Sequence, residues 1–162
     1  MRPGVRFRMP GMYVRPFHDR HGRGLRGPLT PTAVPSYRTR AEHFDRAVLH
    51  AYAPLVARFP EQLAHVDLAV DTIPRMNLRA DMPLFSDEIV ADGPVPLGRI
   101  LPAGVDSQGR PTRTRFVVFR MPIEQRCETA WERKDLLSLV VTALVASYLN
   151  VDPRTIKPDF EL

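Results

Sequence analysis

Residues 133–150, RKDLLSLVVTALVASYLN, decide the fold of this chain. The apolar run from Leu136 to Leu149 is broken only by two serines and a threonine, so a helix over about Arg133 to Leu149 is apolar nearly all round. A helix of that kind is buried on all sides, and we expect it at the centre of the domain. The run is shorter than the ~20 apolar residues that a membrane span needs. The sequence therefore predicts no membrane association.

A second helix is expected near residue 40. Thr39 and Glu42 have the spacing of a capping box, which marks the start of a helix. Apolar residues then recur at steps of three and four and form one face: Phe44, Val48, Ala51, Leu55 and Phe59. Pro54 is expected to kink or shorten this helix, and Pro60 to mark its end.

Strands are expected between the two helices. Residues 66–73 alternate in the manner of a half-buried strand, residues 97–101 form a second short strand, and residues 114–120, TRFVVFR, form the clearest one. Residues 74–96 are interpreted as a long loop, residues 104–112 as a turn, and Pro122 as the lead into a shorter helix. This order lacks βαβ alternation and predicts an α+β fold, in which a small mixed sheet packs against an N-terminal helix and a buried C-terminal helix.

Charge divides the chain into a basic tail and a mildly acidic body. Residues 1–40 hold nine arginines and one acid, Asp19, and so carry +8, which leaves −3 for residues 41–162 out of a total of +5. Six of the 17 prolines and five of the nine glycines also lie in this tail, without apolar periodicity, so we expect it to be mostly disordered. Arg20, Arg23 and Arg26 are its candidate phosphate contacts, which makes nucleic acid a candidate partner of residues 1–40.

Four stretches are similar to one known family in their order and spacing. They are the basic lead-in Asp19 to Pro28, the strand Val66 to Ile73 closed by Pro74, the segment Phe116 to Glu124, and the C-terminal stretches Tyr148 to Pro153 and Ile156 to Phe160. On these residues the chain resembles the small zincin-like metallopeptidases of actinobacteria, also called minimal zincins. The resemblance covers nearly everything from Asp19 onward and implies a minimal zincin-like α+β fold.

The same resemblance implies a zinc site on the last helix. The family signature, His-Glu-x-x-His, places two histidine ligands four residues apart on one helix face, with a glutamate that polarises the metal-bound water. Counted back from Asn150, the ligand positions here are Ala143 and Ser147, and the glutamate position is Leu144. A displaced His-Glu pair five residues earlier would fall on Ser138 and Leu139. The signature is absent in both frames.

The missing signature leaves three hypotheses. The first is a non-catalytic family member that binds a protein or peptide in a cleft lined by Ala143 and Ser147, with no catalytic residue, no metal ligand and no cofactor. The second is an active zinc peptidase whose ligands come from other segments. The third is a nucleic-acid-associated protein that acts through its arginine-rich tail.

Other residues with reactive side chains are interpreted as structural or solvated. His43 and His50 lie seven residues apart on the first helix, too far to chelate one ion without help, and the loop acids Asp81, Asp87, Glu88 and Asp92 are expected to be solvated. Arg126 is expected to lower the pKa of Cys127 slightly, and Trp131 to cover the core as a lid. A single cysteine and the absence of a secretory signal predict a cytoplasmic location.

Overall fold

This computed structural model describes residues 38–75 and 85–162. Within these ranges there are five helices: α1 (Arg40–Arg58), α2 (Pro60–Leu63), α3 (Arg120–Arg126), α4 (Ala130–Leu149) and α5 (Pro153–Ile156). The strands are β1 (Val66–Asp71), β2 (Ile89–Asp92), β3 (Val95–Leu101), β4 (Gly104–Val105), β5 (Pro111–Thr112) and β6 (Thr114–Phe119). The tail residues 1–37 and the segment 76–84 lie outside the described ranges.

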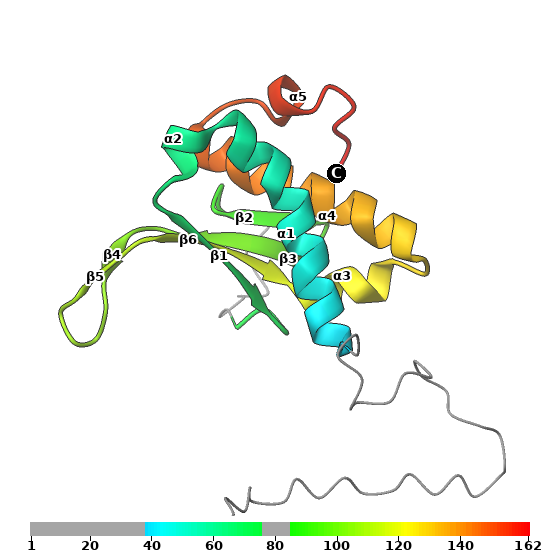
Figure 1. Ribbon diagram of the computed structural model, residues 1–162, viewed down its shortest axis with the longest axis horizontal. Coiled ribbons are helices and arrows are strands. Elements are labelled where there is room, and N and C mark those ends of the chain that lie inside the picture. Colours follow the sequence, from blue (N-terminus) through cyan, green and yellow to red (C-terminus); the bar gives the residue numbers. More distant parts are fainter. Residues whose placement is uncertain (1–37, 76–84) are drawn as a thin grey trace, which may run out of the picture. The chain divides into compact units, whose positions relative to one another are not determined.

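Four strands form one mixed sheet in the order β1-β6-β3-β2. β1 runs parallel to β6, and the other two pairings are antiparallel. β4 and β5 pair only with each other and form a small hairpin that extends from the sheet (Figure 1). The mixed sheet agrees with the prediction.

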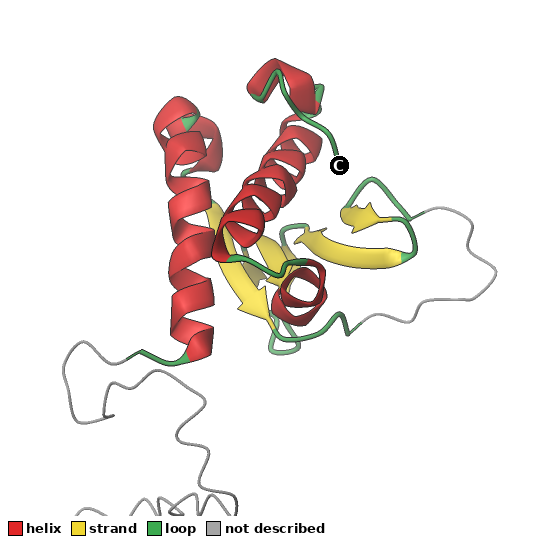
Figure 2. Cartoon of the chain, turned by 90° about the vertical axis from the view of Figure 1, so that its right-hand side faces the viewer, coloured by secondary structure: helices red, strands yellow, loops and turns green. Residues whose placement is uncertain are grey.

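Helices α1 and α4 lie on the same side of the sheet and pack against each other (Figure 2). In β6, Phe116 and Val118 belong to the core that these helices cover, and their register partners on β1, Leu68 and Val70, pack against the same core. The α+β fold, with an N-terminal helix and a buried C-terminal helix on one sheet, is therefore confirmed.

α4 is the central helix because the sheet approaches it closely at a glycine. A Cβ atom at Gly98 of β3 would lie 3.2 Å from Leu144 Cδ1 and 3.3 Å from Val140 Cγ1. Both of these α4 side chains are fully buried. Because Gly98 has no side chain, α4 packs directly against the backbone of β3.

Both long helices begin at a capping box. The Thr39 side chain accepts a hydrogen bond from the backbone N–H of Glu42, and the Glu42 carboxylate accepts one from the backbone N–H of Thr39, as the sequence predicts. Thr129 and Glu132 form the same motif at α4, so α4 begins at Ala130, three residues before the predicted start. α1 continues through Pro54 to Arg58, so the expected shortening is wrong. Pro60 does end it, as predicted, by starting α2.

The interpretation of residues 74–96 as one loop is wrong for its second half. Ile89–Asp92 form β2, and Val95 and Pro96 already belong to β3. Gly93, with φ of +57°, makes the tight turn between the two strands. The two turn residues are Gly93 and Pro94, since Asp92 of β2 pairs with Val95 of β3. Glycine suits the first turn position because it adopts positive φ without steric cost. The register is irregular between Val90 and Ala91.

Candidate functional site

The C-terminal half of α4 is where the family resemblance implies a metal site. Ala143 is 9% exposed and Leu144 is fully buried, and both belong to the hydrophobic core. Leu144 packs over Gly98 of the sheet. Hydrocarbon at these two positions offers no lone pair to a cation, so they act as packing residues.

Ser147, at the second ligand position, is exposed and has a structural partner. Its hydroxyl donates a hydrogen bond to the backbone carbonyl of Asp87, which lies just before β2. This bond joins the last turn of α4 to the segment that enters an edge strand. A serine hydroxyl used in this way secures the end of a helix against a loop.

The displaced frame on α4 is equally unsuited to metal binding. Ser138 and Leu139 are both half-buried, and neither carries a carboxylate or imidazole. The one carboxylate just beyond α4, that of Asp152, caps α5, because it accepts a hydrogen bond from the backbone N–H of Arg154 at 2.8 Å. Asn150 ends α4 in the left-handed conformation, with φ of 56°, as predicted for a C-cap.

Histidines do not gather elsewhere in the described residues. His43 and His50 are exposed on α1, and His65 is exposed just before β1. No three His, Cys, Asp or Glu side chains within residues 38–75 and 85–162 lie close enough together to hold a metal ion. His18, His21 and the candidate phosphate contacts Arg20, Arg23 and Arg26 lie outside the described residues.

The predicted loop acids are solvated where the structure describes them. Asp87, Glu88 and Asp92 are exposed, and Asp92 forms an ion pair with Arg126 at 2.8 Å. Asp81 lies outside the described residues. These carboxylates therefore provide no buried pair for acid–base chemistry.

Two expectations near the start of α4 are wrong. Burial, together with the nearby Glu132 carboxylate, raises the pKa of the Cys127 thiol, and this outweighs the opposing effects of Arg133 and Arg126. Trp131 is 73% exposed and does not cover the core. In the first turn of a helix a large side chain can point into solvent as easily as toward the core, so sequence position alone did not decide its orientation.

An aromatic cluster that the sequence did not predict lies between α1, β6 and α4. The rings of Tyr52 and Tyr148 both meet the ring of Phe116 edge to face, with centroids 6.2 and 5.5 Å away. The Tyr52 hydroxyl is buried without a hydrogen-bond partner among the described residues, and burial raises the pKa of Tyr52. Tyr52 is not among the residues of the apolar face predicted for this helix, and Phe116 and Tyr148 lie far away in the chain, so no local pattern indicated the cluster.

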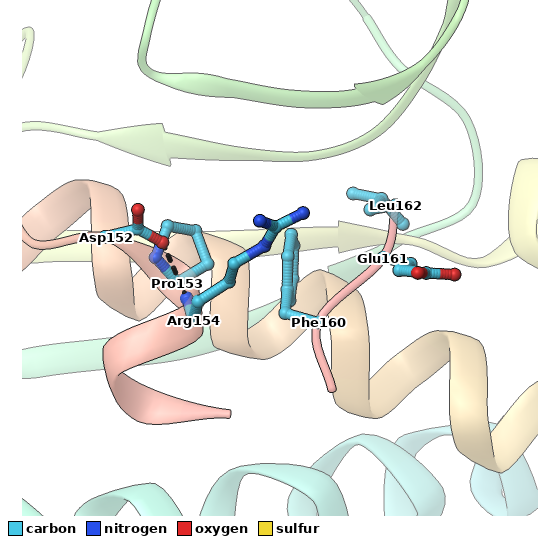
Figure 3. A pocket seen from close by; sticks show the side chains of 6 residues that line it. All are labelled: Asp152, Pro153, Arg154, Phe160, Glu161 and Leu162. Atoms are coloured by element: carbon cyan, nitrogen blue, oxygen red, sulfur yellow. Dashed lines mark hydrogen bonds between the residues drawn. The ribbon is translucent and has the colours of Figure 1, made fainter. Parts of the chain in front are cut away.

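Two cavities lie away from the expected metal site. One, of about 580 Å³, lies at the C-terminal end and is lined by Asp152, Pro153, Arg154, Phe160, Glu161 and Leu162. Figure 3 shows the Arg154 side chain pointing toward the Phe160 ring, with Asp152 held against the backbone of Arg154. The other, of about 270 Å³, lies between α1 and β1 and is lined by Asp45, Val48, Leu49, Leu68 and Val70. Neither cavity is lined by Ala143 or Ser147.

No model of a known protein family matches the chain, and no curated protein matches it. Among the described residues, the helices are all too short or too polar to cross a membrane.

Proposed function

We propose that this chain is a non-catalytic member of the zincin-like metallopeptidase family and acts as a binding or regulatory protein in the cytoplasm. The observation that carries the proposal is the packing of α4 at the signature positions. Ala143 and Leu144 belong to the core, and the Ser147 hydroxyl is bonded to the Asp87 carbonyl. Side chains with these structural contacts are not free to act as metal ligands.

The α+β architecture supports the family part of the proposal. A buried helix lies on a mixed sheet, and the end of that helix lies beside the segment that enters the edge strand β2. In the family this helix carries the metal. In this chain the corresponding helix, α4, is the central element of the core. This is the expected result if only the ligand side chains of the helix were replaced.

The alternative is an active peptidase with ligands from other segments. It requires at least three donor side chains to converge, as in catalytic zinc sites of known enzymes. Within the described ranges such a convergence is missing. Ligands could also come from residues 1–37 and 76–84, so an experiment on the full chain decides between the two functions.

The test is cleavage of a quenched fluorescent peptide library by the full chain, purified without a histidine tag, in the presence of zinc and then of a chelator. The proposal expects no cleavage that zinc supports and the chelator abolishes. The variant Arg46→His is the control for metal loading, because it places a histidine four residues before His50 on the exposed face of α1, and two histidines so spaced can bind zinc together. Chelator-sensitive cleavage by the unsubstituted chain would contradict the proposal.

A further inference from the structure

β1 is an edge strand whose outer side has no strand partner among the described residues. The sheet order places β1 at one edge, where it pairs with β6 alone. An unpaired strand edge presents a row of backbone N–H and C=O groups, which is a template for a further strand. Residues Val66 to Asp71 are all half-buried, as expected for a strand with one free side.

An apolar groove follows this edge on the side that α1 covers. The cavity of about 270 Å³ is lined by Val48 and Leu49 of α1 and by Leu68 and Val70 of β1, with Asp45 at its margin. Leu49 is 59% exposed, and Ile73, just beyond β1, is 52% exposed. Exposed apolar side chains gathered beside a free edge indicate a binding surface more than scattered ones do.

The two faces of β1 carry different kinds of side chain. Val66, Leu68 and Val70 pack toward the core side. The alternate residues Asp67 and Asp71 point to the opposite face, because successive side chains of a strand alternate. No ion pair joins Asp45, Asp67 or Asp71 to a basic side chain within the described ranges. The edge therefore offers apolar contacts on one face and two carboxylates on the other. Arg115 of β6, the register partner of Asp67, lies on the inner side of that second face, away from the free edge.

We propose that the outer edge of β1 binds an extended segment of a partner protein in which apolar residues alternate with lysine or arginine. An added strand would place its apolar side chains in the groove beside Leu49, Leu68 and Val70, and its cations opposite Asp67 and Asp71. Main-chain hydrogen bonds provide the affinity, and the alternating side chains provide the specificity. This inference rests on the proposed binding function and names its site.

The charges disfavour a second copy of the chain that is paired in the symmetric register centred on the middle of β1. A symmetric antiparallel pairing centred on Ala69 would set Asp67 of one copy directly opposite Asp71 of the other, twice. Like charges directly opposed on a sheet are destabilising. A partner strand with lysine or arginine opposite Asp67 and Asp71 would instead form two attractive charge pairs.

The test is fluorescence anisotropy with the full chain at an ionic strength of about 0.15 M, where the Debye length is about 8 Å. The probe is a fluorescein-labelled peptide of about eight residues, the length of an ordinary strand, that alternates valine and arginine. The inference expects it to bind at least about tenfold more tightly than a peptide of the same composition with its valines and arginines in two blocks. Equal affinity for both peptides would overturn the inference, because unpatterned charge attraction would then explain the binding.

Three variants locate the site. Asp67→Lys/Asp71→Lys is expected to weaken binding of the alternating peptide about tenfold and to favour a valine–glutamate peptide instead, since two attractive pairs become repulsive. Leu49→Ser, at an exposed side chain that folding does not need, is expected to weaken binding several-fold. Val105→Ser is the matched control, because Val105 is 70% exposed on the β4–β5 hairpin.

The outcomes separate this inference from the proposed function. Unchanged affinity of Leu49→Ser, or an equal loss in Val105→Ser, overturns the edge site. A dimer of the unsubstituted chain that Leu49→Ser dissociates also overturns it, because a second copy then occupies the edge. Mass spectrometry of the peptide after incubation tests the proposed function separately: chelator-sensitive cleavage contradicts the non-catalytic role and leaves the edge site standing.

Discussion

The hydroxyl of Ser147 donates a hydrogen bond to the backbone carbonyl of Asp87, a residue 60 positions earlier in the chain. The bond connects the exposed last turn of α4 to the segment that leads into β2. At the position where the proposed family resemblance would place a metal ligand, this chain has a contact that holds helix and sheet together.

Replacing Ser147 with alanine should lower the free energy of unfolding by about 0.5–1.5 kcal/mol, the usual net contribution of one hydrogen bond. Urea unfolding followed by circular dichroism measures the change. Ser107→Ala, at the exposed tip between β4 and β5, is the control and should stay within about 0.5 kcal/mol of the unsubstituted chain. Equal stability of the two variants would show that the Ser147 hydroxyl has no structural role.

Gly98→Ala should destabilise the domain by about 1–3 kcal/mol, because the sheet and α4 leave no room for a methyl group. The added Cβ would lie 3.1 Å from the Val117 carbonyl oxygen and 3.2 Å from Leu144 Cδ1. Gly104→Ala is the matched control, since its nearest new contact would be at 3.9 Å. If thermal unfolding shows the same midpoint for both variants, α4 does not pack closely on β3.

The capping box of α4 makes the free energy of unfolding depend on pH in the acidic range. Hydrogen bonds from the backbone N–H groups of Glu128 and Thr129 lower the pKa of Glu132 below its usual 4.5. A lowered folded-state pKa adds stability above the unfolded value, and this is lost as the pH falls through the folded value. Glu132→Gln, which keeps an acceptor oxygen, should therefore show a weaker fall in stability below about pH 4.5. A pH profile of unfolding identical to that of the unsubstituted chain would argue against this hydrogen-bonded carboxylate.

Cys127 should react slowly with iodoacetamide at pH 8. Burial and Glu132 raise the pKa of its thiol, so less of the reactive thiolate is present than in an exposed cysteine. The reaction rate of the folded chain, measured by mass spectrometry, should be lower than the rate in urea. A folded chain that reacts faster than the unfolded one would mean that Arg126 and Arg133 dominate the environment of the thiol.

The sequence predicted those parts of the fold that local chemistry determines. The apolar run of α4, the capping box at Thr39 and the aromatic and β-branched residues of 114–120 each specify an element from neighbouring residues alone. β2 was missed although Gly93-Pro94 is a turn signal, because a four-residue strand has little periodicity. The earlier start of α4 was missed because Thr129 and Glu132 precede the apolar run.

The contacts at the candidate site were beyond prediction from the sequence for a physical reason. The partner of Ser147, the neighbours of Gly98 and the meeting of Tyr52, Phe116 and Tyr148 all join segments far apart in the chain. Chain topology, which no local pattern fixes, decides which of these residues meet. The sequence shows the residue types at positions 143, 144 and 147 directly, but it does not show how they pack.

The zinc content of the full chain, purified without a histidine tag and dialysed against metal-free buffer, tests the central claim most directly. Elemental analysis should find far less than one zinc ion per chain, because Ala143 and Leu144 offer only hydrocarbon and the Ser147 hydroxyl is bonded to Asp87. One zinc ion per chain, retained through dialysis, would contradict the proposal that this chain is a non-catalytic protein without a metal site.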